Sequence, residues 1–201
     1  MKTISFALIM GLFCIALKTN AQHVEFGLKG GLNVADVHSN STNYDARASV
    51  YGGGLAHIHL SEHIALQPEL VYSSQGMKTT VADGSHTLRL NYVNLPVLFQ
   101  YMFGDGFRLQ TGPQLGLLAG AKVKSGGTTT DVKSDYTSGD FSWAFGASYL
   151  TTSGVGVDAR YNLGINNINN TGSSAQLYNR VFQLGLFYQF RHPTVVVVKE
   201  K

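Results

Sequence analysis

Long segments in which apolar and polar side chains alternate with a period of two are the feature that most constrains this chain. Residues 66–101 contain two such segments on either side of a loop rich in Gly, Thr, Ser and Asp. In the first segment Leu70 and Tyr72 fall on one face, and Gln67 and Glu69 on the other. The alternation predicts an antiparallel β-hairpin with two chemically different faces.

The same alternation recurs along the chain and predicts strands, with no convincing amphipathic helix. We expect strands at residues 24–35, 50–60, 64–74, 88–102, 107–119, 140–150, 155–163 and 180–190. Most of these segments exceed the usual strand length of about 5–6 residues and approach the ~9–11 residues that cross a bilayer at a tilt. Their length favours a membrane location.

Short and long connections alternate between the expected strands. The tight turns are residues 61–63, 103–106 and 151–154, and the long polar connections are residues 36–49, 75–87, 120–139 and 164–179. Short turns at one rim and long loops at the other are typical of an outer-membrane barrel with both termini on the periplasmic side. The prediction is an all-β, eight-stranded antiparallel up-and-down transmembrane β-barrel over residues 22–190, with its long loops extracellular.

Bulky apolar side chains occupy one parity of the expected strands, and small or polar side chains occupy the other. A soluble barrel would place its bulky apolar residues inside, so we expect the apolar face to contact lipid. Aromatic residues on this face can form girdles at the two membrane interfaces. The aromatic residues expected there are Trp143, Phe145, Tyr149, Tyr161, Tyr188 and Phe190.

The polar parity predicts the contents of the lumen. An eight-stranded barrel has an interior only wide enough for side chains, and isolated charges inside it would cost too much. We therefore expect the polar groups to pair with one another and to plug the barrel. The expected network consists of Glu25, Lys29, Gln67, Glu69, Arg108, Gln110, Asp158 and Arg160, with His57, His59 and Gln114 on the same face.

Three prolines, Pro68, Pro96 and Pro113, fall inside expected strands. Proline removes a hydrogen bond from the ladder of a sheet. If two strands fold back about the turn at residues 103–106, Pro96 and Pro113 come close to facing each other. We expect a local β-bulge at this place.

The N-terminus has the features of a secretory signal peptide. Lys2 precedes an apolar run over residues 4–17, and the small residue Ala21 follows a short polar stretch. The run is too short to span a membrane comfortably, and we expect cleavage after residue 21. The only cysteine, Cys14, falls in this segment, so the mature chain has neither a disulfide nor a thiol nucleophile.

The C-terminus continues past the aromatic residue at which such a barrel is expected to end. Residues 191–201 follow Phe190, and Pro193 ends the strand. We expect a short periplasmic tail. It is either a disordered extension or, through its run of valines, a strand added to the sheet edge of a partner.

Composition and motifs argue against several function classes. Charged residues make up 13% of the chain against a usual ~25%, and the net charge is only +3. This balance gives no reason to expect a nucleic-acid partner. Since no Gly-x-Ser-x-Gly motif occurs, we expect no enzymatic activity. His57, His59 and His63 could present imidazoles to a metal, but no carboxylate is placed beside them by sequence, and we expect no metal and no cofactor.

Several motifs resemble those of the PorT-like, porin-family outer-membrane β-barrel proteins, a Bacteroidetes-type barrel domain. They are GLKGGLN at 27–33, QPELVYSSQG at 67–76, YVNLPVLFQY at 92–101, GPQLG at 112–116 and RYNLGINNI at 160–168. The resemblance implies an eight-stranded barrel embedded in the lipid of a Gram-negative outer membrane. For one branch of the family it also implies protein partners in the envelope or in a protein-secretion system.

Three functional readings follow from these observations. The first is an integral outer-membrane barrel with a structural or interaction role. The second is a secreted, soluble, lipocalin-like barrel that binds a small apolar ligand, and the third is an outer-membrane barrel enzyme. A soluble binder needs an apolar interior, whereas the interior parity carries Glu, Arg, Asp and Gln.

Overall fold

A computed structural model describes residues 24–39, 45–81 and 84–190. The expected signal peptide (residues 1–21) and the expected tail (residues 191–201) lie outside these ranges. Within them, no helix is long and apolar enough to cross a membrane.

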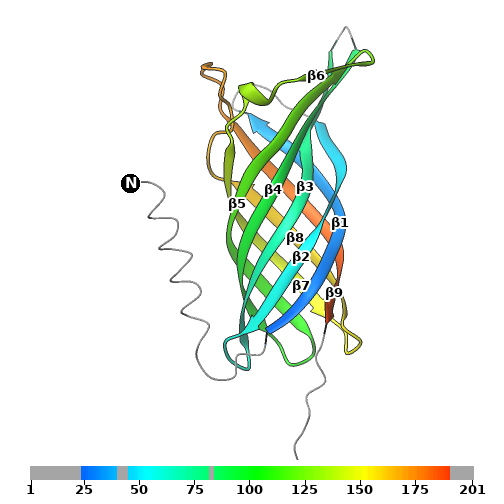
Figure 1. Cartoon of the computed structure of the whole chain (residues 1–201), viewed down its shortest axis with the longest axis vertical. Helices are drawn as coiled ribbons and strands as arrows, with labels where there is room; N and C mark the ends of the chain where they lie inside the picture. The colour runs from blue at the N-terminus through cyan, green and yellow to red at the C-terminus, as the bar shows by residue number, and fades with distance from the viewer. Residues whose placement is uncertain (1–23, 40–44, 82–83, 191–201) are drawn as a thin grey trace, which may run out of the picture.

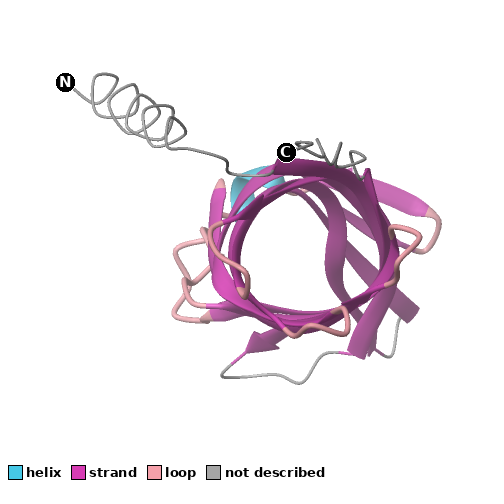
Figure 2. Cartoon of the chain, turned by 90° about the horizontal axis from the view of Figure 1, so that it is seen from below, coloured by secondary structure: helices cyan, strands magenta, loops and turns pink. Residues whose placement is uncertain are grey.

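The described chain forms one antiparallel sheet that closes into a barrel (Figures 1 and 2). The short strand β6 pairs only with β5, so the ring itself has eight strands, in the order β1-β2-β3-β4-β5-β7-β8-β9. The predicted eight-stranded antiparallel barrel is confirmed. The elements are β1 (Val24–Ser39), β2 (Asp45–His59), β3 (Ile64–Val81), β4 (Gly84–Met102), β5 (Phe107–Ser125), β6 (Thr128–Asp131), the 3₁₀ turn η1 (Lys133–Asp135), β7 (Gly139–Leu150), β8 (Val155–Gly164) and β9 (Leu177–Phe190).

The ring closes between the first and the last strand. On β1, Leu28 is opposite Gly54 of β2 on one side and Tyr188 of β9 on the other. Each strand of the ring thus has a partner on both sides, and no row of backbone N–H and C=O groups is left at an open edge.

The tight turns after β2, β4 and β7 lie at one end of the barrel, where β1 also begins and β9 ends (lower end of Figure 1). At the other end the strands run further than the sequence indicated. The expected loop at residues 75–87 is wrong, because β3 and β4 stay paired from Gln75↔Leu90 up to Val81↔Gly84. Threonine and valine favour a strand here, although the surrounding Gly, Ser and Asp have the composition of a loop.

The expected bulge at the prolines is also wrong. Pro96 is opposite Gln114, next to Pro113, so the predicted proximity is confirmed, but the register is the same on both sides of this pair. A proline removes one N–H without adding a residue, and the strands therefore stay in step. The bulge lies further along, where Asn91 pairs with Gly120 and Tyr92 with Leu118, which leaves Ala119 as the extra residue.

Apolar side chains form the outer surface of the barrel. Along β9 the exposed side chains are Phe182, Leu184, Leu186, Tyr188 and Phe190, and the residues between them are buried. At ~3.3 Å per residue and a strand tilt of ~40°, this run rises roughly 20 Å, close to the ~25 Å apolar band of membrane barrels.

Closure between β1 and β9 can be tested with a disulfide. Residues opposite each other in an antiparallel ladder have Cα atoms ~4.5–5.5 Å apart, within the range that a disulfide spans. The double variant Leu28→Cys/Tyr188→Cys is therefore expected to oxidise within one chain. Protection of both thiols from a maleimide reagent in the folded protein, reversed by a reductant, measures this.

The matched control is Leu28→Cys/Leu109→Cys, since β5 lies on the opposite side of the ring from β1. Its thiols are expected to stay reactive under the same oxidation. Equal reactivity of the two variants would contradict the closed ring.

Candidate functional site: the barrel lumen

The inner face of the barrel carries the residues expected there from sequence. The structure buries Glu25, Lys29, Gln67, Glu69, Arg108, Gln110, Asp158 and Arg160, together with His57 and Gln114, whereas His59 is partly buried. Only some of these residues contact one another. Four of them form a central charge cluster, and others hydrogen-bond in smaller groups nearer the ends of the barrel.

The central cluster joins opposite walls of the barrel. Arg160 of β8 donates two parallel hydrogen bonds to the Glu69 carboxylate of β3, at 2.9 Å from Nη1 and 2.8 Å from Nη2. Lys29 of β1 donates to both Glu69 oxygens at 3.3 Å and to Asp158 Oδ2 at 3.1 Å. These four side chains, which we call the charge cluster, are at most 3% exposed. Two cations thus neutralise two anions.

Two uncharged side chains complete the hydrogen bonding of the cluster. Gln67 Nε2 donates to Glu69 Oε1 at 2.8 Å, and the Tyr51 hydroxyl donates to Asp158 Oδ1 at 3.2 Å. The Lys29 ammonium also lies 5.6 Å from the centre of the Tyr51 ring, a cation–π distance. Sequence reasoning missed Tyr51, although it shares the inward parity of His57 on β2.

A second polar group lies toward the tight-turn end. Arg108 Nη1 donates to Gln189 Oε1 at 3.2 Å, and Gln189 Nε2 donates to Glu25 Oε2. Gln110 accepts a hydrogen bond from Gln100 at 3.0 Å. Glu25, Arg108 and Gln110 therefore lie on the predicted inner face, where these hydrogen bonds join them to Gln189 and Gln100.

Toward the long-loop end, a chain of amide side chains follows the charge cluster. Asn33 Nδ2 donates to Ser73 Oγ at 2.9 Å, and Gln183 Nε2 donates to Asn33 Oδ1 at 2.9 Å. Asn162 continues the chain by donating to Gln183 Oε1 at 3.0 Å. This chain crosses β3, β1, β9 and β8. Its members share the inward parity, but the sequence analysis did not select them.

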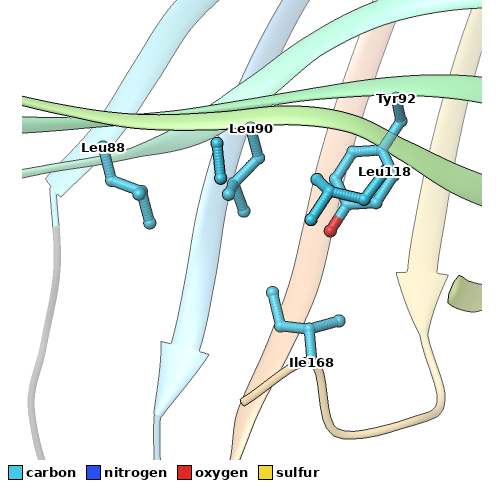
Figure 3. Packing of buried hydrophobic residues seen from close by; sticks show 6 residues of the cluster. Leu88, Leu90, Tyr92, Leu118 and Ile168 are labelled. Atoms are coloured by element: carbon cyan, nitrogen blue, oxygen red, sulfur yellow. The ribbon is translucent and has the colours of Figure 1, made fainter. Parts of the chain in front are cut away.

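Apolar residues occupy the lumen beyond the amides, an arrangement that the polar-lumen expectation missed. Leu88, Leu90 and Tyr92 of β4 point inward and pack with Leu118 and with Ile168 from the β8–β9 connection (Figure 3). Ile168 is fully buried, so this connection contributes a side chain to the apolar group inside the barrel. A smaller apolar group of Leu55, Leu150 and Phe187 lies toward the tight turns.

Two of the three candidate histidines meet on the inner face, and the third lies elsewhere. The His57 and His59 rings meet edge to face with centroids 4.5 Å apart, whereas His63 stacks with Tyr101 on the outer face at 6.0 Å. Among the described residues, no group of three or more His, Cys, Asp or Glu side chains is arranged to hold a metal ion.

The six aromatic residues singled out by sequence lie on the outer face. Tyr188 and Phe190, whose ring centroids are 5.2 Å apart, lie near the tight turns, and so does Tyr149, which is opposite Phe107. Phe145 and Tyr161 face each other higher on β7 and β8. Trp143 Nε1 donates to Thr111 Oγ1 at 2.9 Å, which satisfies the indole at an otherwise apolar surface.

A closed antiparallel barrel with an apolar outer surface and a polar, charge-paired interior is the architecture of a transmembrane β-barrel. Residues 20–170 match the outer membrane protein beta-barrel domain, and the chain belongs to this family. It is therefore an outer-membrane β-barrel protein. This membership contradicts the alternative of a soluble, lipocalin-like barrel.

Solved structures share the fold. Neisserial surface protein A (NspA) is 16% identical over 84% of this chain and 99% of its own, with a TM-score of 0.60. Ail, the attachment invasion locus protein of Yersinia pestis, is 13% identical over 83% of this chain and 98% of its own, with a TM-score of 0.51. At such identities the likeness shows the fold alone. No curated protein matches the chain.

The charge cluster predicts a large effect of a single charge removal. Glu69→Gln leaves Lys29 and Arg160 buried with one anion, and removing one partner of a buried pair costs about 3–5 kcal/mol. We expect a loss of this size in the free energy of unfolding. Urea unfolding of the protein refolded into phospholipid vesicles measures it.

Two variants serve as comparisons. Glu62→Gln, in the exposed β2–β3 turn, is expected to change the free energy of unfolding by less than ~0.5 kcal/mol. Glu69→Gln/Arg160→Met restores charge balance with Lys29 beside Asp158, and is expected to lose less stability than Glu69→Gln alone. A double variant less stable than the single one would refute the assigned pairing.

Proposed function

We propose that this protein is a non-enzymatic outer-membrane barrel whose lumen is plugged and which acts through the surfaces that it presents outside the membrane. The Arg160–Glu69 pair is the observation that carries the proposal. In the ring order, β3 and β8 lie four strands apart, on opposite walls. Hydrogen bonds of 2.8 and 2.9 Å between them cross the lumen from wall to wall.

Other contacts support a closed lumen on both sides of this pair. Lys29 fills the side toward β1, and Gln114, hydrogen-bonded to Ser142 at 3.1 Å, occupies the side toward β5 and β7. The apolar group around Ile168 covers the long-loop end. A hydrated ion would have to break these contacts to pass, which is why we expect a plug rather than a channel.

The outer face supports contact with lipid. Exposed apolar side chains such as Leu28, Leu109 and Leu186 surround the barrel, and the expected aromatic residues lie among them. A large exposed apolar surface on a soluble protein would be an aggregation hazard, whereas in a bilayer it is the matching surface. In the proposed arrangement Trp143, Phe145, Tyr149, Tyr161, Tyr188 and Phe190 contact outer-membrane lipid.

The connections support a direction of insertion. Tight turns and both ends of the ring lie together, as on the periplasmic side of known barrels. The proposal therefore places residues 103–106 in the periplasm, and β6 with the β8–β9 connection outside the cell. The PorT-like motifs around Pro68, Pro96 and Pro113 support membership of that branch, with a protein partner in the envelope or in a secretion system.

Conductance tests the plug. The purified protein in a planar bilayer is expected to give no stable single-channel current. Glu69→Ala/Arg160→Ala removes the contact across the lumen and is expected to give measurable current steps. Steady conductance from the unaltered protein would refute the proposed plug.

Folding must be shown for both proteins in that experiment. A folded membrane barrel migrates differently in SDS before and after boiling, so each preparation is run in both states. A protein that fractionates with the soluble periplasm would instead refute the membrane-embedded proposal.

Single cysteines test the direction of insertion and the partner together. Thr129→Cys in β6 is expected to react with a membrane-impermeant maleimide in intact cells, and Asp105→Cys in the β4–β5 turn is expected to react only after lysis. A photo-cross-linker attached at the same two sites is expected to capture an envelope protein.

Both residues are exposed in the structure, so access from each compartment, rather than burial, decides the labelling. The reverse pattern would invert the topology. Absence of any cross-linked protein at both sites would remove the partner from the proposal and leave the plugged barrel.

A further inference from the structure

The outer face of β4 and β5 changes from apolar to basic near the bulge. On the tight-turn side of it, Leu95, Leu115 and Leu117 are exposed on the outer face. Beyond it, Leu88 and Leu90 are buried on the inner face, and the outer face carries the exposed charges Arg89, Lys122 and Lys124. An outer surface that turns from apolar to basic marks the level at which the strands leave the hydrocarbon region.

Basic side chains from four strands converge just beyond this level. They line a pocket of about 450 Å³ that includes Arg47, Lys78, Arg89 and Lys124. The ladder explains the convergence, since Lys78 of β3 and Lys124 of β5 are both opposite Thr87 of β4. Thr87 and the two glycines after β5, Gly126 and Gly127, lie in the same wall. We call these four cations and their wall the basic rim pocket.

Hydrogen bonds to β3 hold the Arg47 guanidinium in place. Its Nη1 donates to Ser74 Oγ at 3.2 Å and to Gln75 O at 2.7 Å, where β2 and β3 separate. Burial, and after it the positive charge of Arg89, lower the pKa of Arg47. The positive charge of the fixed Arg47 guanidinium is therefore repelled by that of Arg89.

Acidic side chains do little to relieve this repulsion. Asp45 is opposite Lys78 in the ladder, but within the described residues no carboxylate oxygen lies within ion-pair distance of Arg47, Lys78, Arg89 or Lys124. A multiply charged anion in the pocket would offset four cations at once. Guanidinium and ammonium donors fit phosphate oxygens.

We propose that the basic rim pocket binds the phosphate groups of anionic lipid in the external leaflet. The inference rests on the proposed insertion, which places this rim outside the cell. Lipid is favoured over a soluble anion by position, because the pocket is on the outer face and the exposed Leu115 and Leu117 precede Lys124 on the same strand, β5. A lipid whose acyl chains cover these leucines brings its headgroup phosphates to the height of Arg89 and Lys124.

Binding of a phosphorylated glycolipid to the folded full-length barrel tests the inference. The probes are lipid A with two phosphates and lipid A with one, each titrated in detergent and followed by native mass spectrometry. Each surface cation contributes about fivefold to binding of an anionic lipid, so Arg89→Gln/Lys124→Gln is expected to bind the diphosphorylated lipid about 25-fold more weakly. The monophosphorylated lipid is expected to bind the unaltered protein more weakly than the diphosphorylated one.

Lys133→Gln is the matched control, because Lys133 is an exposed cation near the same end but outside the pocket. It is expected to bind like the unaltered protein. Unaltered binding by the double variant, or an equal loss with Lys133→Gln, would overturn the inference. Displacement of the lipid by millimolar inorganic phosphate or by a soluble sulfated glycan would overturn the assignment to lipid.

The two proposals can fail separately. Binding in detergent does not depend on which way the barrel is inserted, whereas the cysteine labelling of Thr129→Cys and Asp105→Cys does. Normal labelling together with no lipid preference would remove the phosphate site and leave the proposed function unchanged.

Discussion

The buried carboxylate of Glu69 imposes the strictest constraint on this barrel. A charge buried in a narrow lumen is tolerated only if opposite charges reach it with good geometry. Arg160 does so from the opposite wall with two parallel hydrogen bonds, and Lys29 does so from β1 while also binding Asp158. The cluster therefore fixes the distance between walls and the relative height of β1, β3 and β8. The amide chain and the apolar group around Ile168 follow it toward the long-loop end.

Closure of the ring and pairing inside it depend on each other. An outer face with exposed residues such as Leu28 and Leu186 suits lipid, where no water can satisfy a free backbone group, so every strand needs two neighbours. Joining β1 to β9 supplies the last row of hydrogen bonds, and the same closure brings Lys29 within reach of Asp158. A soluble sheet could open and hydrate these charges, whereas a lipid-embedded ring retains them.

Period-two alternation was enough to predict the strands, the tight turns and the inward parity of Glu69 and Arg160, because these depend only on neighbouring residues. Which charge meets which could not be predicted, since Arg160 and Glu69 are separated by 91 positions in the chain and meet only through the register of five consecutive strands. The bulge opposite Asn91 was missed for a similar reason, because one unpaired residue, Ala119, is visible only in the ladder. The sequence did contain a signal for the apolar group inside the long-loop end. In this part of β4 the polar residues Arg89 and Asn91 take the outward parity, and the apolar residues take the inward one.

The limited volume of the lumen explains why glycines recur on its inner face. Gly185 of β9 is beside the charge cluster, and a Cβ atom there would collide with the Tyr51 hydroxyl and come within 2.9 Å of Asp158 Oδ1. A Cβ atom at Gly156 would likewise collide with the Phe187 ring. Large side chains such as Arg160, Tyr51 and Phe187 can cross the interior only where the opposing or adjacent position has no side chain. The glycines at these two positions therefore leave the space that the large inward side chains Tyr51 and Phe187 occupy inside the ring.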